Sequence, residues 1–451
     1  MTDGPADRLA QALVANGCDI AFGVPGGGPN LDVVGAMDAN GIRFVLTHGE
    51  TAACIMASVY GHVTGRLSAA VVTRGPGAAS AVNGAAQATL DRHPLVLVTD
   101  TVPATSAARV PHQRLDQRSI LAPASKASAT LGADGDVESW TRFLGQALAA
   151  PAGAVHLDQD STALDSTALD STGQDPADRE MTAGDVTAQN TTATVAGGRN
   201  PAVGRRTLAD MISAAASVGG DRADDANPEP EPEPGERLRS LIAAATKPVL
   251  IVGLGAATGE PIVRSLEAFG APVLTTYQAV GVIPTEHPLS AGLFTNGASE
   301  RPLLRQADLI IAIGLDMVEP IPAPWTYDAP VVSLAANETT DPYLPIAAEV
   351  VGPIGALAPE FLDGANPWRW DADSGAGHRD LVRSELSNRG RPTGSANRAG
   401  RLGPLEVVEA VAAAVPADIT TTVDAGAHFL AIMPWWPVSE PNRLLISNGL
   451  A

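Results

Sequence analysis

The run Phe22-Gly-Val-Pro-Gly-Gly-Gly28, followed along the chain by His48-Gly49-Glu50, indicates the fold class. Each of these motifs comes directly after a short apolar run, Ile20–Val24 in one case and Phe44–Thr47 in the other. A continuous apolar run that ends in a glycine-rich turn is typical of a buried parallel strand that leads into a helix. Two further runs, Ala69–Thr73 and Leu95–Thr99, follow the same pattern.

Helical segments alternate with these predicted strands. The first helix has Pro5 near its first turn, an apolar face that includes Leu9 and Leu13, and Gly17 just after its end. Alanine-rich stretches at 52–63 and 78–90 separate the later strands. We therefore expect α/β domains in tandem, each with three layers built around a parallel sheet.

Composition divides the chain into five parts. After a first domain over residues 1–158, residues 159–235 are rich in Ser, Thr, Asp, Gly and Pro. There Ser161-Thr-Ala-Leu-Asp165 repeats at once, and such composition cannot bury enough apolar surface to offset the entropy of ordering, so we predict a disordered acidic insertion. A Rossmann-like central domain is predicted over 236–365, a polar linker over 366–402 and the start of a third domain over 403–451.

The net charge of −21 excludes the nucleic-acid-binding proteins, which need clustered Lys and Arg. No segment has the length and apolarity of a membrane span, and the N-terminus lacks the pattern of a signal peptide. The two cysteines, Cys18 and Cys54, are far from any Cys or His cluster, so we expect buried thiols and no metal site of their making. These features predict a cytoplasmic protein.

Glu50 is the strongest candidate for a catalytic residue, although an isolated carboxylate at the start of a helix is commonly only a stabilising first-turn acid. Its neighbours favour a functional role. Phe22–Gly28 precedes it, and Thr64-Gly65, Val72-Thr-Arg-Gly-Pro-Gly-Ala78 and Asn83-Gly84 follow in order. This arrangement resembles the pyrimidine-binding domain of thiamine-diphosphate-dependent enzymes of the acetolactate synthase and benzoylformate decarboxylase type. Pro94–Thr99, His112-Gln113 and Gly153–Asp158 extend the resemblance.

The resemblance implies that the Glu50 carboxyl group binds N1′ of the cofactor's aminopyrimidine ring. In an apolar pocket the pKa of a carboxylic acid is raised, so it can exchange a proton with that nitrogen near neutral pH. His112-Gln113 matches the place where acetolactate synthases carry Phe-Gln and pyruvate decarboxylases carry two histidines. Gln113 would orient a substrate or intermediate, and His112 would donate a proton; the alternative is a polar loop pair with no such role.

The glycine-rich turns could be simple strand-to-helix turns, and neither has the spacing of a phosphate-binding P-loop. By resemblance they contact the cofactor instead. The residues that the resemblance implies for cofactor binding are Pro25, Gly26, Gly75, Pro76, Gly77, Asn83, Gly426 and His428.

Gly253-Leu-Gly255-Ala-Ala-Thr-Gly259 follows a predicted strand and resembles a dinucleotide-binding turn, but no acid for a ribose ends the next strand. In acetolactate synthases the central domain binds FAD with the help of an Arg-Phe-Asp-Asp-Arg motif. The corresponding run here is Gly314-Leu-Asp-Met-Val-Glu-Pro320, so we expect no FAD.

The third unit, with Thr422-Val-Asp-Ala-Gly426 and Leu444-Leu-Ile-Ser-Asn-Gly449, resembles the start of the diphosphate-binding domain. The Gly-Asp-Gly motif that holds Mg²⁺ and the diphosphate in relatives has no counterpart, which predicts a C-terminally truncated chain without metal ligands and with weak cofactor binding. The intact protein is predicted to be a thiamine-diphosphate- and Mg²⁺-dependent lyase or carboligase for a small 2-oxo acid, as a homodimer or homotetramer. A 2-oxo acid decarboxylase and a non-catalytic remnant are the alternatives.

Overall fold

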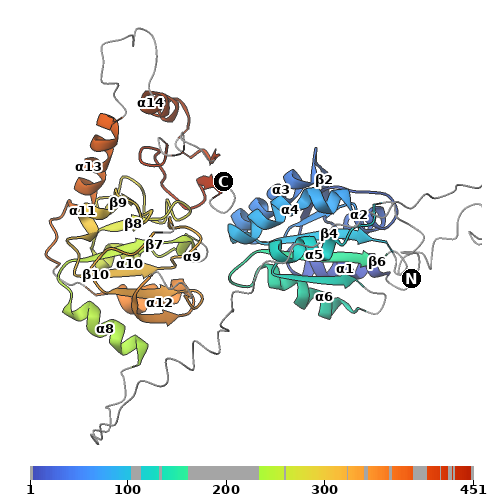
Figure 1. Ribbon diagram of the computed structural model, residues 1–451, viewed down its shortest axis with the longest axis horizontal. Coiled ribbons are helices and arrows are strands. Elements are labelled where there is room, and N and C mark those ends of the chain that lie inside the picture. The colour runs from blue at the N-terminus through green and yellow to red at the C-terminus, as the bar shows by residue number, and fades with distance from the viewer. Residues whose placement is uncertain are drawn as a thin grey trace, which may run out of the picture. The chain divides into compact units, whose positions relative to one another are not determined.

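The computed structural model shows an N-terminal and a central α/β domain, each built on a six-stranded sheet, and a smaller C-terminal element (Figure 1). Within the described part of the chain, no helix is long and apolar enough to cross a membrane. The structure describes residues 4–102, 113–131, 135–160, 233–257, 261–321, 323–339, 344–364, 368–389, 404–416, 418–424, 429 and 432–447.

The N-terminal sheet has the strand order β2-β1-β3-β4-β6-β5, and all neighbouring strands are parallel. This arrangement confirms the predicted fold class. β5 is a strand that the sequence patterns did not indicate, because its half-exposed, polar residues lack an apolar run. The strands are β1 (Ile20–Val24), β2 (Arg43–Leu46), β3 (Ala69–Val72), β4 (Leu95–Thr101), β5 (Ala127–Leu131) and β6 (Ala154–Asp160).

Alternate residues of the central strands pack against helices on opposite faces of this sheet. Val96 and Val98 of β4 join a cluster with α1 (Pro5–Ala15), α2 (Pro29–Ala39) and α6 (Val137–Leu144). Leu95 and Leu97 join a second cluster, formed with α3 (Glu50–Thr64), α4 (Pro76–Leu90) and the short α5 (Gln117–Leu121). The period of two along each strand therefore produces the three layers.

The alanine-rich composition of α3 and α4 permits a close approach between the two helices. Gly84 of α4 lies against Cys54 of α3, where an added Cβ would come within 2.5 Å of the Cys54 Cβ atom. Burial raises the pKa of both Cys54 and Cys18 to about 12, and the Glu50 carboxylate adds to the effect on Cys54. Both cysteines are buried free thiols, as the sequence predicts.

The central sheet is also entirely parallel, in the order β12-β11-β10-β7-β8-β9. Numbered along the chain, this is the doubly wound order of Rossmann-like domains, with its switch point between β7 and β10. The Rossmann-like prediction is therefore correct. The strands are β7 (Pro248–Val252), β8 (Val273–Thr275), β9 (Ser290–Leu293), β10 (Leu309–Ile313), β11 (Val331–Ala335) and β12 (Ile346–Val351).

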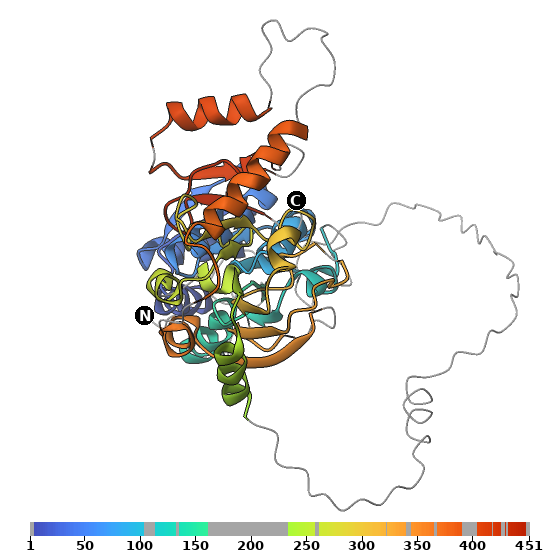
Figure 2. The same ribbon diagram turned by 90° about the vertical axis from the view of Figure 1, so that its left-hand side faces the viewer.

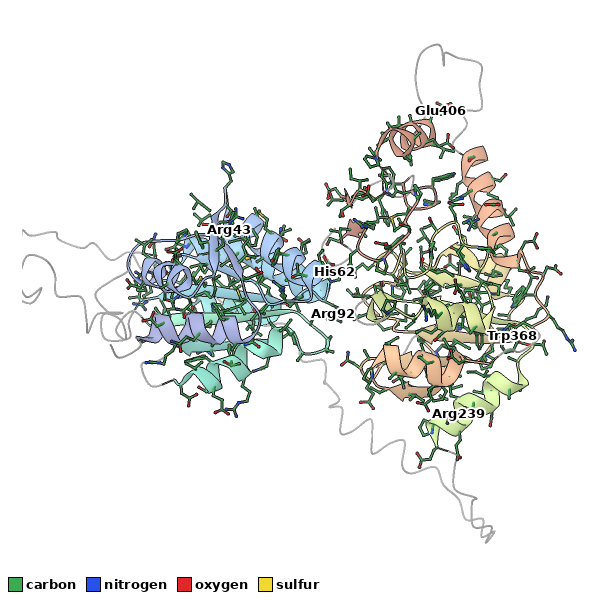
Figure 3. The ribbon with its side chains drawn as sticks, turned by 180° about the vertical axis from the view of Figure 1, so that it is seen from behind. Arg43, His62, Arg92, Arg239, Trp368 and Glu406 are labelled. Carbon is green, nitrogen blue, oxygen red and sulfur yellow. The ribbon has the colours of Figure 1, made fainter. Side chains whose placement is uncertain are left out.

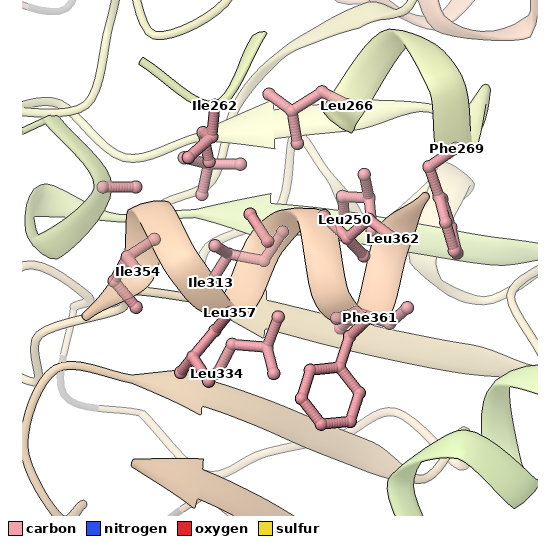
Figure 4. Packing of buried hydrophobic residues seen from close by; sticks show 14 of the residues in the cluster. Leu250, Ile262, Leu266, Phe269, Ile313, Leu334, Ile354, Leu357, Phe361 and Leu362 are labelled. Atoms are coloured by element: carbon pink, nitrogen blue, oxygen red, sulfur yellow. The ribbon is translucent and has the colours of Figure 1, made fainter. Parts of the chain in front are cut away.

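One face of the central sheet is covered by α10 (Val263–Phe269) and α12 (Ile354–Leu362) (Figure 4). Leu357 and Phe361 of α12 meet Leu334 and other branched residues of the strands there. The short helix α9 (Leu254–Ala257) follows β7 and joins the same core, and α11 (Arg301–Leu304) precedes β10. The opposite face packs against α11 and the aromatic side chains of a long loop.

Two longer helices pack against the two edge strands of the central sheet. Figure 2 shows the molecule turned by 90°. α8 (Pro234–Ala244) packs against β12, and its Arg239 lies over the Phe361 ring at 4.5 Å (Figure 3). α13 (Ser374–Arg389) packs against β9. Trp368, on the way to α13, donates a hydrogen bond from its indole to the Phe269 carbonyl.

Helix α13 corrects the polar linker that the sequence predicts over residues 366–402. Its sequence is polar, but the Arg379 side chain is buried and donates to the carbonyl oxygens of Thr285 at 2.7 Å and His287 at 3.1 Å. These contacts come from another part of the chain, so local composition does not reveal them.

Two boundaries of the predicted insertion also differ. β6 includes Gln159 and Asp160, and α8 begins at Pro234, inside the range 159–235 assigned to the insertion. The rest of the insertion lies outside the described residues.

The C-terminal element contains α14 (Pro404–Ala414) and a two-stranded parallel sheet of β13 (Thr421–Val423) and β14 (Leu444–Ile446). All three elements lie within the range 403–451 assigned to the third unit. Val408, Val423 and Leu444 are buried in one cluster with Tyr277 and Val280, which come from the chain after β8.

Candidate cofactor site

Glu50 and the glycine-rich turns proposed for the cofactor lie at the carboxyl ends of β2, β1 and β3, three neighbours in the N-terminal sheet. The chain leaves β1 for β2 on one side and later returns to β3 on the other. The ends of β1 and β3 therefore flank a topological switch point, where open α/β sheets bind ligands. Three turns meet at this edge: 25–28 after β1, 47–50 after β2 and 73–77 after β3.

The turn after β1 is shaped by Gly26 and Asn30. The Gly26 N–H donates to Asn30 Oδ1 at 2.8 Å, and a Cβ on Gly26 would lie 2.4 Å from Thr73 Oγ1, so no side chain fits there. Asn30 is fully buried, yet its Nδ2 group has no hydrogen-bond partner among the described residues. A buried donor of this kind requires an acceptor, which a bound nitrogen heterocycle or a water molecule can supply.

Glu50 is the first residue of α3 and follows an extended Gly49. The side chain is half-buried, and its Oε1 atom lies 3.5 Å from the position that a Cβ on Gly77 would take. The carboxylate therefore faces the turn after β3, across the switch point. The structure thus brings Glu50 close to Gly77.

The turn after β3 is held on two sides. Gly75 has φ +62°, a conformation that favours glycine, and an added Cβ would come within 2.3 Å of the Gln113 carbonyl oxygen. Pro76 then begins α4, where its missing N–H costs nothing. Gly77 has no room for a side chain, because Thr73 Cγ2 lies 2.7 Å from its Cβ position.

The other predicted residues are less closely tied to this edge. Gln113 meets the turn through its backbone, while its side chain is exposed. Asn83 lies on the exposed face of α4, two helical turns beyond Pro76. His112, Gly426 and His428 lie outside the described residues.

A buried polar cluster behind the turn after β3 did not emerge from the sequence patterns. It contains Thr99 and Asp100 of β4, Gln117 of α5, and His156 and Asp158 of β6, which we call the Gln117 cluster. Polar residues toward the carboxyl ends of β4 and β6 are the signal that could have indicated it, since ligand sites form at that end of a sheet.

Charges in this cluster are compensated. Burial raises the pKa of Asp100, against the opposing effect of Arg74, whose Nε lies 2.8 Å from Asp100 Oδ2. Burial also raises the pKa of Asp158, but hydrogen bonds from His156, Thr99 and Gln117 outweigh it and leave the pKa below its usual value. Asp158 is therefore an ionised carboxylate inside the domain.

The central-domain turn after β7 does not fit a dinucleotide phosphate. Backbone N–H groups that would bind a phosphate already donate elsewhere: Gly253 to the Ile313 carbonyl, Gly255 to the Gly314 carbonyl and Leu254 to Glu319 Oε2, at 2.8 to 2.9 Å. Anion-binding turns depend on free amides. The structure thus adds a reason, independent of the missing arginine-rich motif, to expect no FAD at this turn.

We expect purified protein to be colourless, with no absorbance band near 450 nm (the flavin region), because residues 253–255 offer no free amide to the FAD diphosphate. The measurement is the visible spectrum together with the supernatant of heat-denatured protein. A stoichiometric yield of FAD in that supernatant would show that the turn opens to admit it.

Within the described ranges, no group of three or more His, Cys, Asp or Glu side chains could hold a metal ion.

Comparison with known proteins agrees with the geometry. Residues 5–120 match the family model "Thiamine pyrophosphate enzyme, N-terminal TPP binding domain", and residues 236–360 match the central-domain model of the same enzymes. Acetolactate synthase of Bacillus subtilis is 26% identical over 461 residues, covering 99% of this chain and 71% of that protein. A probable 2-ketoarginine decarboxylase of Pseudomonas aeruginosa is 27% identical, covering 94% of this chain and 67% of its own length.

A solved structure has the same fold. The thiamine diphosphate-dependent 4-hydroxybenzoylformate decarboxylase of Rhodococcus jostii superposes with a TM-score of 0.67 at 18% identity, over 99% of this chain and 75% of the decarboxylase. That structure shows the fold, while the two family models together with the curated relatives show that the chain belongs to the thiamine pyrophosphate enzymes of the acetolactate synthase and benzoylformate decarboxylase type.

Proposed function

We propose that this protein uses thiamine diphosphate to act on a small 2-oxo acid, as a lyase or carboligase of the acetolactate synthase kind. The observation that carries the proposal is the Glu50 carboxylate, half-buried at the switch point beside the Gly75–Gly77 turn. A decarboxylase that releases an aldehyde is the second candidate, because relatives with both activities match almost the whole chain.

The proposed roles follow from the chemistry of the side chains. When bound, thiamine diphosphate would supply an acidic carbon–hydrogen bond and an electron sink for the electron pair that remains when the substrate's carboxylate leaves as carbon dioxide. Glu50 gives a proton to N1′ of the pyrimidine ring and takes it back, which general acid–base chemistry permits for a carboxyl group in hydrogen-bond reach. Pro25, Gly26, Pro76 and Gly77 form the surrounding wall.

Gln113 and His112 are proposed to face the substrate. The positive φ of Gln113, +57°, places the chain there in a conformation that is uncommon for a residue other than glycine. Such strain is often retained at functional sites. Asn83, Gly426 and His428 remain proposals for cofactor contacts.

Several further proposals concern the assembled protein. We propose that Mg²⁺ accompanies the cofactor and is bound by residues other than those of this chain. A homodimer or homotetramer in the cytoplasm, with neither nucleic acid nor membrane as a partner, completes the proposal. A non-catalytic role stays the alternative.

The test uses a chimera, in which this chain continues from Ala451 into the C-terminal part of the Bacillus subtilis acetolactate synthase. With thiamine diphosphate and Mg²⁺, we expect the chimera to release carbon dioxide from pyruvate, 4-hydroxybenzoylformate or 2-ketoarginine. Acetolactate among the products would favour the carboligase, and an aldehyde alone the decarboxylase.

Calorimetry provides the control. The 451-residue chain by itself is expected to bind the cofactor weakly, and tight Mg²⁺-dependent binding would contradict the proposal that Mg²⁺ is held elsewhere. A chimera that binds the cofactor but releases no carbon dioxide from any of the three acids would contradict the substrate class.

A further inference from the structure

Gln117 connects the interior of the N-terminal domain to the proposed cofactor site. Its side chain is buried, with 3% exposure, and all of its polar capacity is directed at named partners. The Oε1 atom accepts the Gly75 N–H at 3.0 Å. The two hydrogens of the Nε2 group are directed at three acceptors: Thr99 Oγ1 at 3.0 Å, the Asp100 carbonyl at 2.7 Å and Asp158 Oδ1 at 2.5 Å.

These partners permit one orientation of the Gln117 amide. The Gly75 N–H can only donate, and both the Asp100 carbonyl and the ionised Asp158 can only accept. Exchanging the amide oxygen and nitrogen would place donor against donor at Gly75 and acceptor against acceptor at Asp158. The buried acceptors therefore fix the orientation of the Gln117 amide, which keeps its oxygen directed at the Gly75 N–H.

Asp158 is itself held in place. It accepts from Thr99 Oγ1 at 2.5 Å and lies 3.2 Å from His156 Nε2, while His156 Nδ1 is 2.9 Å from Ser128 Oγ. The carboxylate and the imidazole are both buried. A cluster in which every member has a partner is rigid, because moving one group leaves another unsatisfied at a cost in free energy.

The turn that Gln117 contacts has a second support in the same cluster. The Arg74 N–H donates to Asp100 Oδ1 at 2.8 Å, next to the Gly75 N–H bound by Gln117. Two consecutive amides at the end of β3 are thus bound by side chains from β4 and α5. Gly77, two residues further on, is the residue that faces Glu50.

We infer that Gln117, fixed by Asp158, is a positioning residue that sets the Gly75–Gly77 turn at the distance from Glu50 that cofactor binding requires. The inference has two halves: Gln117 holds the turn, and the held turn favours cofactor binding. The second half rests on the proposed function. It concerns Gln117 through the turn, and no contact of Gln117 with the cofactor is implied.

Hydrogen–deuterium exchange of the 451-residue chain tests the first half without any cofactor. Pro76 has no N–H, and in a fragment over residues 74–76 the Arg74 nitrogen is a free amine that exchanges at once, so the fragment reports only the Gly75 amide. In Gln117→Met we expect the Gly75 amide to exchange about tenfold faster, as the loss of one hydrogen bond predicts, while amides of 95–98 in β4 stay unchanged.

The matched control is Gln159→Met. Gln159 of β6 is equally buried, but neither polar atom of its side chain has a partner among the described residues, so its replacement removes a buried amide without touching the turn. Gly75 exchange that stays at the wild-type rate in Gln117→Met, or that rises equally in Gln159→Met, would overturn the inference.

The second half is measured on the chimera as the Kd for thiamine diphosphate. We expect Gln117→Met to weaken binding about tenfold and Gln159→Met to leave it unchanged, with both variants folded by circular dichroism. Faster Gly75 exchange with unaltered affinity would mean that Gln117 supports only the fold, and would overturn the positioning role. A wild-type chimera that fails to bind the cofactor would instead overturn the proposed function, and the inference with it.

Discussion

In the cofactor-loaded chimera, Glu50→Gln is expected to slow exchange of the cofactor's C2 proton with deuterated solvent by about 10²- to 10⁴-fold, the usual contribution of a positioned acid–base group. Glutamine has the same shape and can still contact N1′, but it cannot carry a proton. The rate is measured by NMR after acid quenching, before any substrate is added.

Glu138→Gln is the control for the simpler reading of Glu50. Like Glu50, Glu138 is an acid in the first turn of a helix, and its side chain is 89% exposed. If Glu50 only stabilised the start of α3, both substitutions would leave C2 exchange unchanged. A variant that exchanges as fast as wild type, with cofactor bound, would remove Glu50 from the proposed mechanism.

The second large effect concerns stability and pH. We expect wild type to lose stability as the pH rises, and we expect Glu319→Gln to lack the part of this loss that Glu319 causes. Burial raises the pKa of Glu319 from 4.5 to about 7, although Leu254, Thr276 and Asp316 donate hydrogen bonds to it. Because the pKa is raised in the folded state, the stabilisation is fully present below pH 4.5 and is lost as the pH rises through 7. The shift corresponds to a contribution of Glu319 to the free energy of unfolding on the order of 3 kcal/mol.

Other groups titrate in the same range, so the quantity to measure is the difference in unfolding free energy between wild type and variant at pH 5 and at pH 8. Between pH 5 and pH 8, the unfolding free energy of Glu319→Gln should rise relative to that of wild type. Glu338→Gln replaces an exposed acid of the same domain and should follow wild type at both pH values. Equal behaviour of the two variants would show that Glu319 is ionised throughout.

Local sequence patterns predicted much of the fold because each helix or strand can be recognised from a few neighbouring residues. The apolar run 20–24 and the glycines after it are enough to give a buried strand and a turn, and β1 has the predicted bounds. Helix α13 shows the limit. Its polar sequence forms a helix against β9 because Arg379 finds carbonyl acceptors on the chain between β8 and β9.

The sequence by itself determined the α/β class, the glycine turns and the place of Glu50 at the end of a strand, since each depends on neighbours along the chain. Only the tertiary structure decided which turns face each other and what stands behind them. Gln117 meets Asp158 across 41 residues and Gly75 across 42, because the order of β3, β4 and β6 brings their carboxyl ends together. Hydrogen-bond partners so distant in sequence are selected by strand order and burial, and neither is written in the residues on each side of Gln117.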